Sequence, residues 1–320
     1  MRRIACCTSL FDQDNMSIRP AMNISAVERE TGLGKDTLRV WERRYGFPSP
    51  ARDANGERVY PAEQVERLRL MKRLIDQGHR PGRLLASSDA ELAERCRVRT
   101  APAAAGDDPT ECLLAGTIQL IRQHDVAALQ QSLGQAMMRL GLQRFVIELV
   151  APLNRAVGEA WMNGQFEVYE EHLYTEQIKS LLRLAIGNLP AGSGRPRILL
   201  TTVPDEAHAL GLLMVQALLA LDGANCISLG TQTPVFDIER AATAHQADVV
   251  ALSFSAAFPA RQLATVASQL RQLLPASIAL WLGGSGVQRL PPQPGVVLLA
   301  SLQEAVDALA SWRNGGTAGN

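Results

Sequence analysis

The sequence predicts a multidomain fold made of an all-α N-terminal domain, a four-helix bundle, and an α/β domain with a doubly wound parallel sheet. Three observations support this prediction. The 320 residues exceed the usual size of one domain. Apolar residues recur at helical spacing between 110 and 187. From 197 to 299, short β-rich segments alternate with helical ones, which is typical of parallel sheets.

Composition narrows the classes of protein that the chain can belong to. With 47% hydrophobic and 20% charged residues, the chain suits globular packing. No apolar run approaches the roughly 20 residues needed to cross a bilayer, and the first residues resemble no secretory signal. We therefore expect a cytoplasmic protein. The five cysteines contain no C-x-x-C pair, which argues against a zinc site or a disulfide framework.

Charge is distributed unevenly although the formal net charge is zero. Residues 23–85 hold 13 Lys and Arg against 9 Asp and Glu, whereas residues 189–320 hold 7 Arg against 8 acids. The basic excess marks the N-terminal segment as the part that contacts a polyanion.

Breaks in periodicity predict the domain boundaries. Residues 1–22 form a leader without clear periodicity, to which we assign no function. Residues 98–109 combine Pro, Gly and Ala without an apolar period and predict a linker. The expected domains are therefore 23–97, 110–189 and 190–316.

Two different patterns of apolar residues predict the bundle and the α/β domain. Four apolar-periodic stretches predict antiparallel helices at about 110–122, 125–140, 142–163 and 167–187. Strands are expected at 197–203, 226–229, 249–254, 278–282 and 296–299. Ligands of such sheets bind at the carboxyl ends of the strands.

Residues 24–45 predict two helices around a glycine turn, and the second helix is rich in arginine. Val27, Leu33, Leu38 and Trp41 form an apolar side that would seat this helix on its neighbours. The opposite side offers cations to phosphates or guanine edges. Next, Asn55-Gly56 forms a turn between two short strands and predicts a wing. The combination indicates a winged helix-turn-helix domain.

The run from Thr37 to Tyr60 resembles the MerR family, whose T-L-R-x-W-E-R-R-Y-G, P-x-R and G-x-R-x-Y motifs it matches. The resemblance implies a double-stranded operator DNA as partner. The candidate DNA-contacting residues are Lys35, Thr37, Arg39, Arg43, Arg44, Arg52, Arg58 and Tyr60. An isolated arginine run more often forms a solvated helix face, but the wing and the turn favour DNA binding. No long dimerising helix follows Gly78, so we expect a dimer or tetramer to assemble elsewhere.

Glu206, His208 and Gly211 follow the first expected strand of the α/β domain and open a helix. An imidazole at this point can coordinate a metal through one nitrogen, while the carboxylate two residues earlier fixes its tautomer. Gly211 leaves room for a bulky group. A lone histidine at a strand end is more often structural. Here, small residues at the next strand ends predict a slot for a long ligand, and they include Ser253, Ser255, Gly283 and Gly284.

The order E-x-H-x-x-G, S-x-S and G-G resembles the cobalamin-binding domain of methionine synthase, B12-dependent mutases and B12 photoreceptors. The resemblance implies a Rossmann-like fold with His208 as the lower axial ligand of cobalt. It also implies that the displaced nucleotide tail lies between Ser253 and Gly283-Gly284.

In the bundle, nine residues separate Trp161 from Glu171-His172. This spacing resembles the W-x9-E-H signature of light-responsive MerR regulators of the CarH and LitR type. An indole would cover the upper face of the macrocycle, and a carboxylate would hold ribose hydroxyls of an adenosyl group. Spacing alone would leave Trp161 as a core residue. Met162 stands where some of these photoreceptors have a histidine, which leaves a bis-histidine light product in doubt. His79, His124 and His245 have no partners at a spacing that suggests metal binding, and we expect them to be surface or capping residues.

These patterns together favour a cobalamin-binding sensor that regulates transcription. The resemblance implies a homo-oligomer, assembled through the cobalamin-binding module, that represses genes in the dark with adenosylcobalamin bound and is reversed by light. Methylcobalamin is the alternative cofactor. A second hypothesis is a MerR-type regulator that responds to another ligand or to B12 level without light. A third is a corrinoid methyltransferase or mutase, but no segment is long enough for the separate substrate domain that such enzymes need. We expect no enzymatic activity.

Overall fold

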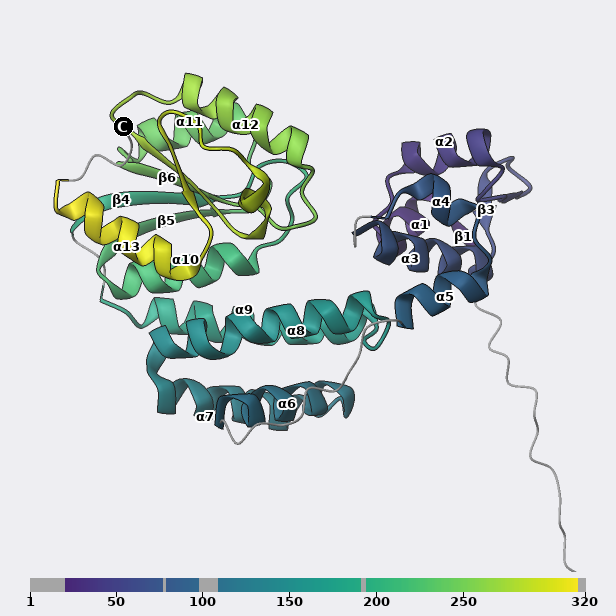
Figure 1. Cartoon of the computed structure of the whole chain (residues 1–320), viewed down its shortest axis with the longest axis horizontal. Helices are drawn as coiled ribbons and strands as arrows, with labels where there is room; N and C mark the ends of the chain where they lie inside the picture. The colour runs from purple at the N-terminus through teal and green to yellow at the C-terminus, as the bar shows by residue number, and fades with distance from the viewer. Residues whose placement is uncertain (1–20, 77–78, 98–108, 191–193, 316–320) are drawn as a thin grey trace, which may run out of the picture. The chain divides into compact units, whose positions relative to one another are not determined.

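A computed structural model describes residues 21–76, 79–97, 109–190 and 194–315 (Figure 1). Its contacts divide the chain into two compact units, Met1–Thr100 and Ala101–Asn320. Nearly all of the expected leader and of the expected linker lie outside the described residues.

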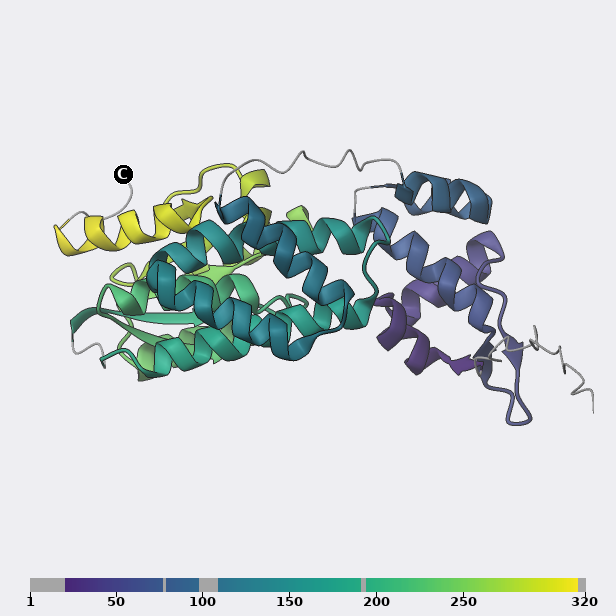
Figure 2. The same cartoon turned by 90° about the horizontal axis from the view of Figure 1, so that it is seen from below.

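The N-terminal unit contains the expected helix-turn-helix. Asn23 caps α1 (Ile24–Thr31) by accepting a hydrogen bond from the Ala26 N–H, and Gly32 ends that helix with φ 67°. The arginine-rich second helix is α2 (Lys35–Tyr45), and three helices complete the unit, α3 (Ala62–Asp76), α4 (Pro81–Leu85) and α5 (Asp89–Arg97). The expected wing is the hairpin of β2 (Ala51–Arg52) and β3 (Arg58–Tyr60), which projects from this unit in Figure 2. A third strand, β1 (Met22–Asn23), pairs with β3 and was not anticipated from the sequence.

The bundle has the helices that the periodicity predicted. They are α6 (Pro109–Arg122), α7 (Val126–Arg144), α8 (Ala151–Met162) and α9 (Val168–Gly187). Gly141 interrupts α7 with φ 73°, and the chain then continues through a π-helical segment, η1 (Phe145–Val150), into α8. The break at Gly141 explains why the sequence indicated one helix before it and another after it.

The α/β domain is a five-stranded parallel sheet in the order β5-β4-β6-β7-β8. Its strands are β4 (Gly194–Thr201), β5 (Ala224–Gly230), β6 (Val249–Ser253), β7 (Ala279–Gly283) and β8 (Val296–Leu299). One face is covered by α10 (Leu210–Leu221) and α13 (Leu302–Arg313), and the other by α11 (Val235–Ala244) and α12 (Ala260–Leu273) (Figure 1). The chain leaves β4 to one side for β5 and crosses back to β6, which makes the carboxyl end of β4 the switch point where ligands bind.

Helix α10 belongs to two cores at once. Leu210, Met214 and Leu218 lie in the apolar core of the bundle. Leu212 and Leu219, on the other side of the helix, pack with the sheet. The bundle and the α/β domain are therefore joined along the helix that begins directly after the E-x-H-x-x-G motif's histidine.

Candidate functional site

The E-x-H-x-x-G motif forms a hydrogen-bonded network around Glu206, whose side chain is buried at the end of β4. One carboxylate oxygen, Oε1, accepts from the backbone N–H of His208 at 3.0 Å and contacts its Nδ1 at 2.6 Å. The other oxygen, Oε2, accepts from the backbone N–H and the hydroxyl of Ser255, at 2.7 and 2.8 Å. Four contacts thus fix the carboxylate.

This network determines which nitrogen of His208 is presented to a ligand. Because an ionised carboxylate only accepts hydrogen bonds, Nδ1 carries the proton and Nε2 carries the lone pair. The His208 side chain is 66% exposed, although Glu206 beneath it is buried. Burial alone would raise the pKa of Glu206, but the hydrogen bonds from His208 and Ser255 outweigh it and hold the pKa below its ordinary value.

A second layer of hydrogen bonds supports the loop that carries Glu206. The Thr202 hydroxyl donates to the carbonyl oxygen of Glu206 at 2.5 Å and accepts from the Gln232 N–H at 2.9 Å. The Thr233 N–H donates to the Thr202 carbonyl, and the Thr201 and Thr233 hydroxyls lie 2.7 Å apart. Thr202 was not predicted from the sequence, because only the strand order places β4 beside β5.

The small residues at the strand ends allow close approach between elements. A Cβ on Gly211 would lie 3.0 Å from the Ser253 hydroxyl, so Ser253 fills the room expected at this glycine. Gly284 has φ 94°, and a Cβ there would lie 2.4 Å from the carbonyl oxygen of Phe254. The G-G pair thus packs against the turn after β6. Ser255, one of the predicted cofactor-binding residues, also hydrogen-bonds Glu206.

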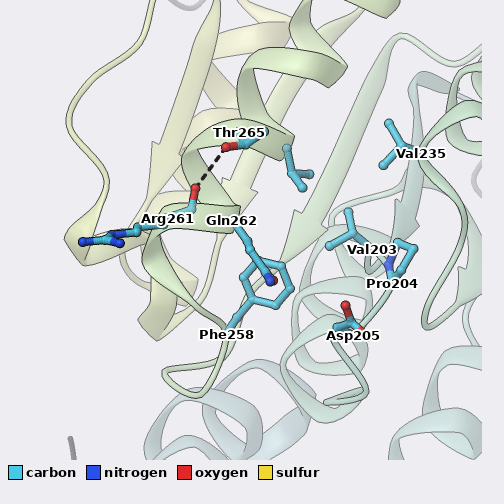
Figure 3. Close-up of a pocket in the computed structure, with 9 residues that line it drawn as sticks. Val203, Pro204, Asp205, Val235, Phe258, Arg261, Gln262 and Thr265 are labelled. Atoms are coloured by element: carbon cyan, nitrogen blue, oxygen red, sulfur yellow. Dashed lines mark hydrogen bonds between the residues drawn. The ribbon is translucent and has the colours of Figure 1, made fainter. Parts of the chain in front are cut away.

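A cavity of about 380 Å³ adjoins this network at the same edge of the sheet (Figure 3). Its walls include Val203, Pro204 and Asp205, which directly precede Glu206. Val235 and Phe258 contribute apolar surface from the α11 and α12 side. None of the predicted site residues lines this cavity.

The predicted cap residues lie at the α8–α9 end of the bundle. Trp161, one residue before the end of α8, packs partly buried against the bundle core. Glu171, in the first turn of α9, accepts from the Thr175 hydroxyl at 2.7 Å, and His172 is 70% exposed with its Nε2 3.7 Å from Glu171 Oε2. Their role as a cap remains a prediction.

The predicted DNA-contacting residues differ in how they are held. Arg43 and Arg44 are exposed on α2, and neither forms an ion pair with a described residue. The others are Lys35, which pairs with Glu28; Arg39, which pairs with Asp36; Arg58, which pairs with Glu42; Arg52, which donates to the Gly56 carbonyl; and Thr37, which is exposed. The exposed cations and the wing form a surface suited to phosphate and base contacts.

Tyr60 is a correction to the predicted DNA interface. Its side chain has no exposed surface and belongs to the core of the N-terminal unit with Leu38 and Trp41. Residues alternate along β3, and the side chain that follows Val59 therefore points inward. Tyr60 supports the wing from inside and is not available to DNA.

Comparisons with known proteins assign both parts of the chain to known domain families. Residues 22–83 match the MerR HTH family of regulatory proteins, and residues 113–185 and 196–310 each match a B12 binding domain. The HTH-type transcriptional repressor CarH of Myxococcus xanthus is 31% identical over 269 residues, which cover 80% of this chain and 86% of CarH. The chain belongs to the family of B12-binding, MerR-type transcriptional regulators.

Further similarities extend along most of this regulator. The repressor CarA of Myxococcus xanthus is 30% identical over 279 residues, covering 83% of this chain and 88% of CarA. A monomethylamine corrinoid protein of Methanosarcina barkeri superposes with a TM-score of 0.50 at 14% identity, covering 62% of this chain and 97% of that one. At that identity the superposition shows the shared fold alone. Within the described residues, the regulator has no helix with the length and apolar character of a membrane span.

Proposed function

We propose that this regulator binds adenosylcobalamin through His208, binds operator DNA as a repressor in the dark, and releases the DNA in light. The observation that carries the cofactor proposal is the Glu206 network. It fixes the His208 ring by a 2.6 Å contact and places the proton on Nδ1, which makes Nε2 the nitrogen able to coordinate a metal.

The residues around the network suit a bulky, flat cofactor. Ser253, Gly283 and Gly284 occupy the strand ends where the sequence pattern expects the nucleotide tail. Trp161, Glu171 and His172 would face the upper side from the bundle. When bound, adenosylcobalamin supplies a cobalt–carbon bond that visible light breaks.

We further propose that the cofactor acts by favouring a homo-oligomer assembled through the cobalamin-binding module. A ligand shifts assembly only through different affinities for the two states. In the N-terminal unit, α4 and α5 are short, with 5 and 9 residues, and they offer little surface for a helical dimer. DNA binding by two arginine-bearing helices would then require the cofactor-dependent contact.

Size-exclusion chromatography with absorption spectra tests this proposal on the full chain loaded with adenosylcobalamin, in darkness and after green light. We expect a coloured oligomer that dissociates on illumination and loses affinity for DNA selected from a random pool. A coloured species that ignores light would indicate a sensor of B12 level, an alternative that Met162 keeps open. A colourless protein would contradict cobalamin binding.

A further inference from the structure

The α6–α7 turn contacts the α8–α9 turn through side chains that the proposed cofactor site does not use. The α6–α7 turn consists of the three residues 123–125. Its last residue, Asp125, caps α7 by accepting a hydrogen bond from the Ala128 N–H. The second turn separates Trp161 from Glu171. Any contact between the two turns therefore acts on the segment that carries the predicted cap.

His124 is the centre of this contact, and its side chain is 53% exposed, in line with the expected surface histidine. Its Nε2 lies 3.2 Å from Glu170 Oε1 and 3.0 Å from the Tyr169 hydroxyl. Its ring also packs against Tyr169, with centroids 5.5 Å apart and planes tilted by 40°. His124 has φ 56°, a left-handed conformation that is unfavourable in a residue other than glycine. Surrounding contacts must hold that conformation.

Glu170 connects His124 to the first turn of α9. Its side chain is 9% exposed. Its second oxygen, Oε2, accepts from the Glu167 N–H at 2.7 Å, and the two glutamates form a reciprocal capping box. The same carboxylate thus fixes where α9 begins and where His124 lies. Glu171 follows it directly.

Arg122 holds the other side of the α8–α9 turn. Its guanidinium donates to Gln165 Oε1 at 3.2 Å and lies 5.8 Å from the ring centroid of Phe166, which is fully buried. The N–H groups of Gln165 and Phe166 in turn donate to the carbonyl of Ala160, at 2.8 and 3.2 Å. Arg122 therefore acts on the residues that end α8 next to Trp161.

We infer that Arg122 and His124 form a clamp that positions Trp161 and Glu171 toward the upper face of the cofactor. The inference rests on the proposed cofactor site, and both residues are positioning residues that touch no cofactor. Contacts on both sides of this five-residue turn fix the relation between the end of α8 and the start of α9. Loosening the clamp should weaken contacts to the adenosyl group while leaving the coordination by His208 unchanged.

The test compares the affinities of the full chain for adenosylcobalamin and for hydroxocobalamin, which lacks the adenosyl group. For His124→Ala we expect about 10-fold weaker binding of adenosylcobalamin and less than about 2-fold change for hydroxocobalamin, as for other positioning residues. The visible spectrum of the hydroxocobalamin complex should stay the same. The conservative His124→Gln should recover part of the loss.

Gln130→Ala is the matched control. It removes a 2.7 Å hydrogen bond between α7 and α9, from Gln130 to Gln177, outside the two turns. We expect it to leave the affinity ratio unchanged. Hydrogen–deuterium exchange provides a readout without cofactor, because His124→Ala should speed exchange of the backbone amides in the α8–α9 turn and Gln130→Ala should not.

Each outcome decides one question. An unchanged affinity ratio and unchanged exchange in His124→Ala would overturn the clamp while the cofactor site stands. Equal losses for both cobalamins, or equal effects of Gln130→Ala, would indicate a general stability role and would also overturn it. A wild-type chain that binds neither cobalamin would defeat the proposed function together with this inference.

Discussion

The two candidate binding regions of this regulator are built in opposite ways. The buried carboxylate of Glu206 makes four hydrogen-bond contacts. They fix the orientation of the His208 ring, although the His208 side chain is 66% exposed. On α2, by contrast, Arg43 and Arg44 are exposed, and the more enclosed Arg58 is neutralised by Glu42. A single metal–nitrogen bond requires one geometry, whereas a polyanion accepts cations in many geometries. The two candidate binding regions of one chain therefore differ in how far their side chains are fixed in advance.

The largest effect should come from His208→Ala. Loss of the coordinating nitrogen should weaken cobalamin binding by more than about 100-fold and abolish the spectrum of the histidine-coordinated form. Titration followed by absorption measures both. His245→Ala, which removes the C-cap histidine of α11, is the control and should change neither. A His208→Ala protein with an unchanged spectrum would show that the ligand assignment is wrong.

Glu206→Gln should have the next largest effect, about 10- to 100-fold on cobalamin affinity, because an amide has one acceptor oxygen and cannot accept from both His208 and Ser255. The substitution should also change how stability depends on pH. The folded pKa of Glu206 lies below its ordinary value, so its carboxylate stabilises the fold at neutral pH and this stability is lost as pH falls through the folded pKa. Thermal unfolding should show a difference from wild type at pH 7 that shrinks toward acid. A constant difference at all pH values would contradict this account.

On the DNA side, Arg43→Ala should weaken operator binding by about 5- to 100-fold and leave cobalamin affinity unchanged. Fluorescence anisotropy over a series of salt concentrations separates the two kinds of contact, because loss of a phosphate contact lowers the salt slope by about 0.9. Arg58→Ala is the informative comparison. Because Glu42 already neutralises Arg58, we expect this substitution to change the salt slope less than Arg43→Ala does. Equal slopes for both variants would remove the distinction between exposed and paired arginines.

Tyr60→Phe should have the smallest effect. Among the described residues, the buried Tyr60 hydroxyl finds no hydrogen-bond partner, so its removal should leave stability unchanged or raise it by up to about 1 kcal/mol. Operator affinity should remain within about 2-fold of wild type, because the residue does not reach DNA. Chemical denaturation and anisotropy measure the two quantities. A large loss of operator affinity would restore Tyr60 to the DNA interface.

The sequence by itself determined the elements and the chemistry of the motifs. Helical spacing placed α6 to α9 within a few residues, and β-rich runs placed the five parallel strands. These signals are local, because periodicity records which face of each element avoids water. The E-x-H spacing likewise puts Glu206 within reach of His208 through neighbouring positions alone.

Only the tertiary structure decided which distant residues complete each site. Ser255 reaches Glu206 because β6 lies beside β4, and Gln232 reaches Thr202 because β5 lies on the other side. His124 likewise meets Glu170 only when α6 and α9 pack in one bundle. Burial and hydrogen bonding of this kind depend on the order of strands and the packing of helices, which no local spacing encodes.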